Sequence, residues 1–228
     1  MTATAPVVTL DGPGGSGKGT VARAVARRLG WHLLDSGAIY RILALAAERA
    51  GVATDDPDGL VGTAANMHVE FTADTDGTPR VMLDGDDVSL DIRTETCGDR
   101  ASQVAALPAV RRALLQRQRD FRQPPGLVAD GRDMGTVVFP DAAAKIYLTA
   151  SVEERARRRY NQLKEQGLSG NLTTLSEEIA ARDRRDASRD ASPLVPAPDA
   201  VRVDTTGVPV EEVIEIVMSQ VQERLGLN

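Results

Sequence analysis

The chain of 228 residues has 27 basic and 33 acidic side chains, a formal net charge of −6, and 42% hydrophobic residues. This charge disfavours bulk attraction to nucleic acid or to an anionic membrane. Cys97 is the single cysteine, which excludes an internal disulfide and a thiolate metal cluster. The length fits one domain with elaborations, or two small domains. Because the sequence shows neither a signal-peptide pattern nor an apolar run of about twenty residues, we expect a cytoplasmic protein that binds no membrane. We also expect a monomer that binds no nucleic acid.

Only three of the 27 basic residues are lysines, namely Lys18, Lys145 and Lys164. A coding bias towards arginine accounts for many surface positions, but a rigid guanidinium fork also suits phosphate better than an ammonium does. Residues 155–189 hold nine basic and five acidic side chains. This local excess of positive charge is a candidate phosphate clamp within an acidic chain.

Short apolar runs alternate with segments of helical period, which is the pattern of an α/β protein with a mainly parallel sheet. The predicted strands, apolar on both faces, span 7–10, 31–34, 126–129, 144–148 and 200–203. The predicted helices span 18–29, 37–50, 102–122, 152–166, 175–187 and 210–225. Capping boxes are predicted at Ser151 with Glu154 and at Thr174 with Glu177.

The strongest motif is a glycine-rich segment at 12–20, which follows the first predicted strand and leads into the first predicted helix. The segment has the G-x-x-x-x-G-K spacing of a P-loop. Its backbone N–H groups are expected to surround phosphate oxygens, with Lys18 against the β- and γ-phosphates. Gly19 stands where the usual pattern has Ser or Thr, and the Lys-Gly-Thr ending is typical of nucleoside-monophosphate kinases. The predicted ATP-binding residues of the loop are Gly12, Pro13, Gly14, Gly15, Ser16, Gly17, Lys18, Gly19 and Thr20.

Other P-loop proteins are weighed against this interpretation. A GTPase is excluded because no lysine follows an asparagine, as the guanine-reading Asn-Lys-x-Asp element requires. A P-loop ATPase without an acceptor stays open at this point, as does a kinase for UMP, AMP or a hydroxylated metabolite.

Two further strand ends carry charged or polar residues. Ser36 lies near the N-cap of the helix after the second strand, and Arg41 lies about one turn further in. Asp130 follows the third strand, at the carboxyl edge where ligands bind in open α/β sheets. We expect no direct protein ligand for the Mg²⁺ that accompanies ATP; Asp130 or Thr20 is a candidate to hold it through water, with an ordinary turn aspartate as the alternative for Asp130.

Residues 68–89 break the alternation of strands and helices. Asp76-Gly77 and Asp84-Gly85 are hairpin signals that separate strand-like segments. We therefore predict a small antiparallel unit inserted into the parallel fold.

Arg182, Asp186 and Arg189 share one face of a predicted helix, because their spacing is i, i+4, i+7. From spacing alone, a solvated stripe of salt bridges is the better interpretation.

Five segments together resemble the bacterial cytidylate kinases, which phosphorylate CMP and dCMP from ATP. The resemblance covers essentially the whole chain. It is carried by DGPGGSGKGT at 11–20, WHLLDSGAIYR at 31–41, ASQVAALPAVR at 101–111, ADGRDMGTVVFPDA at 129–142, and 182–196 with its PLVP. It implies a P-loop kinase: a parallel five-stranded sheet flanked by helices, with a small inserted antiparallel unit and a helical lid.

The resemblance also implies a division of the chain and roles for individual residues. The core would be 1–60, 101–151 and 190–228, the monophosphate-binding insertion 61–100, and the lid with the helix after it 152–189. The residues implied to face CMP are Ser36, Arg111, Asp133 and Arg189 at the cytosine, Ser102, Arg182 and Asp186 at the sugar, and Arg41 and Arg132 at the acceptor phosphate.

The lid arginines would act on ATP. Arg155 would lie near adenine, and Arg158 or Arg159 would reach the transferring phosphate, so that these two join Lys18 and Arg132 as the implied catalytic residues. For Arg157 a charged helix surface is the favoured interpretation.

The chemistry of these assignments is consistent. Cytosine presents an amino donor beside a ring-nitrogen acceptor, so a carboxylate paired with an arginine complements it, whereas uracil reverses both groups. The second pKa of a nucleoside monophosphate is near 6, so the attacking oxygen needs no general base. We expect direct in-line transfer that rests on positioning and charge, with closure of the lid excluding water.

Overall fold

The computed structural model describes residues 4–73, 79–165, 167, 169–189 and 191–227. The chain divides into two compact units. Unit 1 consists of Met1–Asp35 and Gln118–Asn228, and unit 2 of Ser36–Arg117.

Unit 1 is built on a parallel sheet of five strands, β1 (Val7–Asp11), β2 (His32–Asp35), β6 (Leu127–Gly131), β7 (Ala144–Thr149) and β8 (Val201–Asp204). Their order is β2-β6-β1-β7-β8, and every neighbouring pair is parallel. All five predicted strands are therefore confirmed, each within one or two residues. The carboxyl ends of the strands share one edge of the sheet, which places the residues after them close together.

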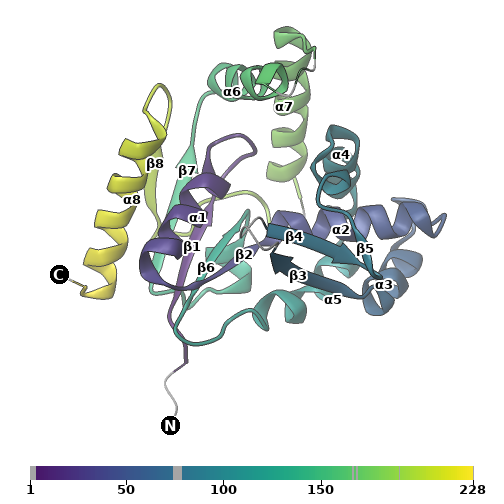
Figure 1. The fold of residues 1–228 in the computed structure, drawn as a ribbon, viewed down its shortest axis with the longest axis horizontal. Helices are drawn as coiled ribbons and strands as arrows, with labels where there is room; N and C mark the ends of the chain where they lie inside the picture. The colour runs from purple at the N-terminus through teal and green to yellow at the C-terminus, as the bar shows by residue number, and fades with distance from the viewer. Residues whose placement is uncertain (1–3, 74–78, 166, 168, 190, 228) are drawn as a thin grey trace. The chain divides into compact units, whose positions relative to one another are not determined.

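The helices of unit 1 are α1 (Lys18–Leu29), the π-helix η2 (Met134–Val138), α6 (Val152–Glu165), α7 (Leu172–Ala187) and α8 (Val210–Leu225). Helices α1 and α8 lie side by side against the sheet, where Val25 and Val217 pack into one core with Leu10 and Ile146 (Figure 1). Helices α6 and α7 pack against each other. The apolar face predicted for 210–225 is thus confirmed as core.

The two predicted capping boxes have different outcomes. The Ser151 hydroxyl accepts the Glu154 N–H at 3.1 Å, so the first half of that box is present. The reciprocal bond is replaced, because the Glu154 carboxylate pairs with arginines of α6 and the Ser151 N–H donates to Thr206. The box at Thr174 is wrong: α7 begins at Leu172, and the side chain of Asn171 accepts the N–H groups of Thr173 and Thr174.

Unit 2 contains α2 (Ser36–Arg49), α3 (Pro57–Asn66), the 3-10 turn η1 (Asp91–Arg93), α4 (Glu95–Val104) and α5 (Pro108–Arg119), whose last two residues lie in unit 1. Its antiparallel sheet is β3 (Val69–Ala73), β4 (Pro79–Leu83) and β5 (Asp86–Asp87), in that order. This sheet confirms the predicted insertion. Asp84 and Gly85 both have positive φ, as a two-residue hairpin turn requires, whereas the Asp76-Gly77 signal lies outside the described residues.

The single helix predicted over 102–122 is wrong. The structure has α4, capped at Thr94, and then a separate α5 that starts at Pro108. A proline fits the first turn of a helix but disfavours a helical conformation at the residue before it, here Leu107. The helix α3 was not predicted; it begins where Asp56 accepts the Gly59 N–H and Pro57 takes the first position.

Leaving aside η1 and η2, the helices in the described part of the chain have ten to sixteen residues. Within the same residues we find no helix with the length and apolar character that spanning a bilayer demands.

Candidate active site

The loop between β1 and α1 closes around Lys18. The carbonyl oxygen of Pro13 accepts two side-chain bonds, from Ser16 Oγ at 3.0 Å and from Lys18 Nζ at 2.7 Å. Gly17 has φ 89 and caps α1, whose first turn is bonded back to the Gly17 carbonyl. The loop therefore holds the ammonium of Lys18 inside its own curve, as a phosphate-binding loop does.

Gly12 marks the closest approach of the loop to the sheet. Its φ is 143, and a Cβ added there would lie 1.9 Å from the carbonyl oxygen of Leu148 in β7. No side chain fits in that space, so the loop can leave β1 along this path only with glycine at position 12.

Gly19 lies against a carboxylate. A Cβ at this position would be 3.3 Å from Asp130 Oδ2, which is tighter than ordinary contact. Asp130 belongs to β6 and stands in register with Asp35 at the end of β2. Because Gly19 has no side chain, the Asp130 carboxylate has room beside the loop. Asp35 is a second carboxylate at this site, and no sequence motif predicted it.

Burial shifts the pKa values of the charged groups at this edge of the sheet. It lowers the pKa of Lys18 to about 7, to which the nearby positive charge of Arg132 also contributes. It raises the pKa of Asp130 to about 6, against the stabilising charge of Lys18. An ammonium whose pKa is held this low gains much from a polyanion beside it.

Arg132, which follows β6, reaches the same loop. A Cβ on Gly14 would lie 3.4 Å from Arg132 Nη2. The guanidinium is held by Asp186 of α7, with 3.2 Å between Nε and Oδ2. Asp186 also pairs with Arg189, and its side chain is only 3% exposed. The solvated stripe favoured from spacing is therefore wrong at Asp186 and Arg189, because both are buried in an ion-pair cluster; Arg182, one turn before Asp186, is half-buried.

Asp133 precedes the π-helix η2, and its carbonyl oxygen accepts the N–H groups of Val137 and Val138. The start of η2 is fixed by Asp11, whose two carboxylate oxygens accept the N–H groups of Met134 and Gly135, each at 2.8 Å. Asp11 is 4% exposed, and burial raises its pKa to about 7. The segment with Arg132 and Asp133 is thus tied to the end of β1.

Arg155 of α6 connects three parts of unit 1. Its Nε donates to the Ala150 carbonyl at 3.0 Å, and its Nη1 donates to the Gly14 carbonyl at 3.1 Å. The two Nη groups also bind both oxygens of Asp183 in α7, at 3.1 and 2.5 Å. Arg155 therefore holds the P-loop and α7 together, while the contact with adenine that the resemblance implies stays a prediction.

The other α6 arginines have distinct surroundings. Arg158 binds Glu154 at 3.0 Å and also contacts Thr205, the residue after β8. Arg159 donates to Gln162 at 2.8 Å. Arg157 also pairs with Glu154, but its side chain is 61% exposed, so the surface interpretation of Arg157 is confirmed. Thr205 carried no motif signal, because its contacts come from distant segments.

The predicted CMP residues of unit 2 lie on three helices: Ser36 begins α2, which also carries Arg41; Ser102 is on α4 and Arg111 on α5. The Arg41 guanidinium donates to the carbonyl oxygens of Ile92 and Thr94. Arg111 donates to the Ala105 carbonyl and lies 5.4 Å from the centre of the Tyr40 ring. Both arginines are thus held by backbone or aromatic partners within the unit.

Comparison with known proteins gives a consistent family. The family model described as "Cytidylate kinase" matches residues 8–223. The chain is 58% identical to the cytidylate kinase of Pseudomonas fluorescens (strain SBW25) over 225 residues, which cover 98% of both chains. It is 59% identical to that of Methylococcus capsulatus over 222 residues, covering 97% of this chain and 99% of the other.

Two solved structures with lower sequence identity also match. A gluconokinase from Sinorhizobium meliloti 1021 has a TM-score of 0.47 and 14% identity, covering 96% of this chain and 92% of that one. A shikimate kinase from Bacteroides thetaiotaomicron has a TM-score of 0.43 and 14% identity, covering 97% and 99%. At these values neither neighbour bears on the activity.

Proposed function

Because the chain belongs to the cytidylate kinase family, we propose that it transfers the γ-phosphoryl group of MgATP to CMP or dCMP, giving ADP and CDP or dCDP. The observation that carries this proposal is the family match over residues 8–223. The site geometry supports it: Lys18 and Arg132, two cations, lie together at the P-loop. Such a pair suits a reaction that brings two phosphates into contact.

The transfer is direct and in line. The CMP phosphate is already largely deprotonated at neutral pH, so its oxygen attacks the γ-phosphorus without a base. Lys18 leaves the Pro13 carbonyl for the β- and γ-phosphates, and Arg132, oriented by Asp186, holds the acceptor phosphate. Rate acceleration then comes from orientation and from charge stabilisation.

The donor set at the carboxyl edge fits a magnesium ion. Asp35 ends β2 and is in register with Asp130, the second-last residue of the neighbouring strand β6. Mg²⁺ is commonly held by one or two carboxylates together with water and substrate phosphates. Asp130 would hold the ion through water, with Asp35 and the Thr20 hydroxyl as further oxygen donors. When bound, Mg²⁺ supplies neutralisation of phosphate charge.

The nucleotides use separate parts of the chain. Gly12 to Thr20 and the lid residues 152–189 contact ATP, with Arg155 at the adenine side and Arg158 or Arg159 at the transferring phosphate. The insertion 61–100 contributes to monophosphate binding. Support for the lid comes from Arg155, which bonds the Gly14 carbonyl and thereby couples α6 to the P-loop.

Base selection rests on Asp133 with Arg189, Arg111 and Ser36, and sugar binding on Ser102, Arg182 and Asp186. A carboxylate and an arginine complement the amino group and ring nitrogen of cytosine, and uracil presents the opposite pattern. Arg41 joins Arg132 at the acceptor phosphate. The buried ion pair of Asp186 with Arg189 supports this assignment, because it fixes two of these groups relative to each other.

We also propose that the protein acts as a monomer in the cytoplasm, in pyrimidine nucleotide metabolism, and binds neither nucleic acid nor membranes. The net charge of −6 and the single cysteine support this setting.

The decisive experiment is an ADP-release assay with MgATP and a panel of CMP, dCMP, UMP and AMP. We expect CMP and dCMP to drive ADP formation far better than UMP or AMP, and Lys18→Ala to lower kcat by orders of magnitude without loss of fold. Asp133→Ala should raise KM for CMP and reduce the preference over UMP.

Two outcomes would overturn the proposal. ADP release that does not depend on any acceptor would identify an ATPase. Release driven best by UMP, AMP or another acceptor would identify a different kinase, and both results are readable from the same panel.

A further inference from the structure

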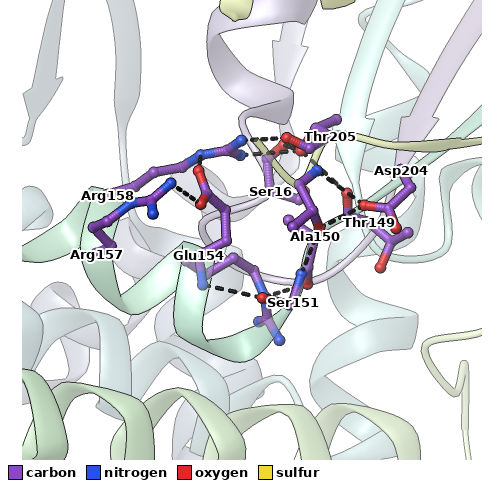
Figure 2. A network of polar contacts seen from close by, with 11 residues as sticks. Ser16, Thr149, Ala150, Ser151, Glu154, Arg157, Arg158, Asp204 and Thr205 are labelled. Carbon is purple, nitrogen blue, oxygen red and sulfur yellow. Dashed lines mark hydrogen bonds and ion pairs between the residues drawn. The ribbon is translucent and has the colours of Figure 1, made fainter. Parts of the chain in front are cut away.

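Thr205, which directly follows β8, lies where three segments of unit 1 meet. Thr205 is buried, with 1% of its surface exposed. Its Oγ1 is 3.2 Å from the Ser16 carbonyl oxygen in the P-loop and 3.1 Å from the Thr149 carbonyl oxygen at the end of β7. Its backbone N–H also donates to the Thr149 carbonyl at 2.8 Å. Figure 2 shows the dashed lines that join Arg158 to Thr205, with Ser16 close to both.

The Thr205 hydroxyl both accepts and donates a hydrogen bond. Arg158 Nη1 donates to Oγ1 at 3.0 Å, so this oxygen acts as an acceptor towards α6. A hydroxyl carries one hydrogen, which is then given to the Ser16 or the Thr149 carbonyl. The hydroxyl therefore lies between the guanidinium of Arg158 and two backbone carbonyls, one in the P-loop and one at the end of β7.

Arg158 is held through all three nitrogens of its guanidinium. Nε donates to Glu154 at 3.0 Å and Nη2 to the Thr205 carbonyl at 2.5 Å, in addition to the Nη1 bond. Of the five N–H groups of an arginine, these bonds between described residues engage three. The side chain keeps 29% exposure, and Nη1 is 3.8 Å from where a Cβ on Gly17 would lie. Nη1, which keeps a second N–H, is thus beside the phosphate-binding loop.

We propose that Thr205 is a positioning residue for phosphoryl transfer: it sets Arg158 beside the P-loop so that this arginine meets the γ-phosphate of ATP. The inference rests on the proposed function. A flexible arginine loses side-chain entropy when it binds phosphate, and a guanidinium already held by Thr205 and Glu154 has lost much of that freedom beforehand. Thr205 acts through Arg158 and need not contact a substrate.

A purely structural role would look different. If Thr205 only joined β7, β8 and the P-loop, its loss would lower stability without regard to which nucleotide is bound. If it positions Arg158 for the γ-phosphate, its loss weakens ATP more than ADP, and the effect disappears when Arg158 is absent.

The test compares Thr205→Val, which keeps the shape and removes the hydroxyl, with Thr205→Ser, which keeps the hydroxyl. Thr206→Val is the matched control, because Thr206 is exposed and bonds Ser151 and Asp204 instead. Calorimetric Kd values for MgATP and MgADP are measured together with kcat and both KM values. We expect Thr205→Val to lose about tenfold or more in kcat/KM for ATP, as loss of a hydrogen bond to a charged group predicts.

The same variant should lower the ratio of ADP to ATP dissociation constants, with KM for CMP within about twofold of wild type if the sites are independent. Thr205→Ser should keep most of the wild-type kcat/KM for ATP and most of the ratio of ADP to ATP dissociation constants. Thr206→Val should resemble wild type in both. In an Arg158→Met background, adding Thr205→Val should have little further effect.

Contrary results are distinct from failure of the proposed function. Unchanged ATP and ADP affinities in Thr205→Val, or effects that add to those of Arg158→Met, would overturn the positioning role. A wild-type protein without CMP-dependent ADP release would overturn the kinase assignment, while the ATP-to-ADP comparison would still decide whether Thr205 acts through Arg158.

Discussion

Asp11 and Met134, 123 positions apart in the sequence, are joined by a 2.8 Å hydrogen bond from the Met134 N–H to a carboxylate oxygen. The second carboxylate oxygen accepts the Gly135 N–H at the same distance. Since Asp11 precedes the P-loop and Met134 follows Asp133, this contact fixes the proposed ATP loop relative to Asp133, the residue that we propose reads the base of CMP.

Asp11→Asn tests that link. The substitution keeps the shape, but one carboxylate oxygen becomes an amino group that faces a backbone N–H, so a buried donor loses its partner. We expect the free energy of unfolding to fall by about 2 kcal/mol and KM for CMP to rise. Urea denaturation and steady-state kinetics measure the two effects.

The control for Asp11→Asn is Asp141→Asn, an equally conservative change in an ion pair with Arg122 where the aspartate side chain is 62% exposed. It should change stability by less than about 1 kcal/mol. Equal effects of the two variants would contradict the role of Asp11.

Gly12→Ala should remove nucleotide binding. An added Cβ would lie 1.9 Å from the Leu148 carbonyl oxygen at a φ of 143, so the loop must leave its path. Gly30→Ala is the matched control: it also has a positive φ, 67, but meets nothing within 4 Å. We expect Gly30→Ala to lower the free energy of unfolding by about 1 kcal/mol and to bind ATP normally. Calorimetry with MgATP distinguishes the two variants. Normal ATP binding by Gly12→Ala would show that the loop tolerates a side chain there.

ATP binding should take up a proton at pH 8. The pKa of Lys18 is lowered to about 7 without nucleotide, so the amine is mostly neutral at pH 8. Phosphates beside it favour the charged form and raise its pKa, which draws a proton from solution. Binding heats measured in two buffers with different ionisation enthalpies give the number of protons.

This proton uptake should diminish at pH 6, where Lys18 is already protonated, and should be absent in Lys18→Met. An equal uptake in Lys18→Met at pH 8 would assign the proton to another group, such as Asp130.

Asp186→Ala should impair CMP use and stability together. It leaves Arg132 and Arg189 without the buried carboxylate that pairs with both. We expect the free energy of unfolding to fall by about 2 kcal/mol. This is less than for a fully buried ion pair, because the Arg132 side chain is 26% exposed. Glu177→Ala, an exposed change on the same helix, serves as the control. If KM for CMP stayed at the wild-type value in Asp186→Ala, the cluster would be structural only.

Local patterns predicted much of this structure. The five strands and the P-loop helix follow from apolar runs and a motif whose partners are adjacent in sequence. The break at Pro108 shows where periodicity misleads, since an apolar pattern that continues across a proline does not reveal that two helices share it.

The unpredicted contacts join segments that are far apart in the chain. Arg155 with Asp183, Asp11 with Met134 and Thr205 with Ser16 depend on where the sheet brings strand ends together, which spacing along one helix cannot give. Burial is missed for the same reason: Asp186 has the spacing of a surface stripe, and only packing against Arg132 and Arg189 removes it from solvent.

The strand that leads into the P-loop is bonded on both sides, to β6 and to β7. A central strand cannot fray from an edge, so its amides exchange with deuterium only when much of the domain opens. The amides of β1 should therefore be among the slowest to exchange, and their exchange rates would report the global stability of unit 1. Lys18, the proposed catalytic lysine, thus lies seven residues after the end of a strand that we expect to be among the slowest to exchange.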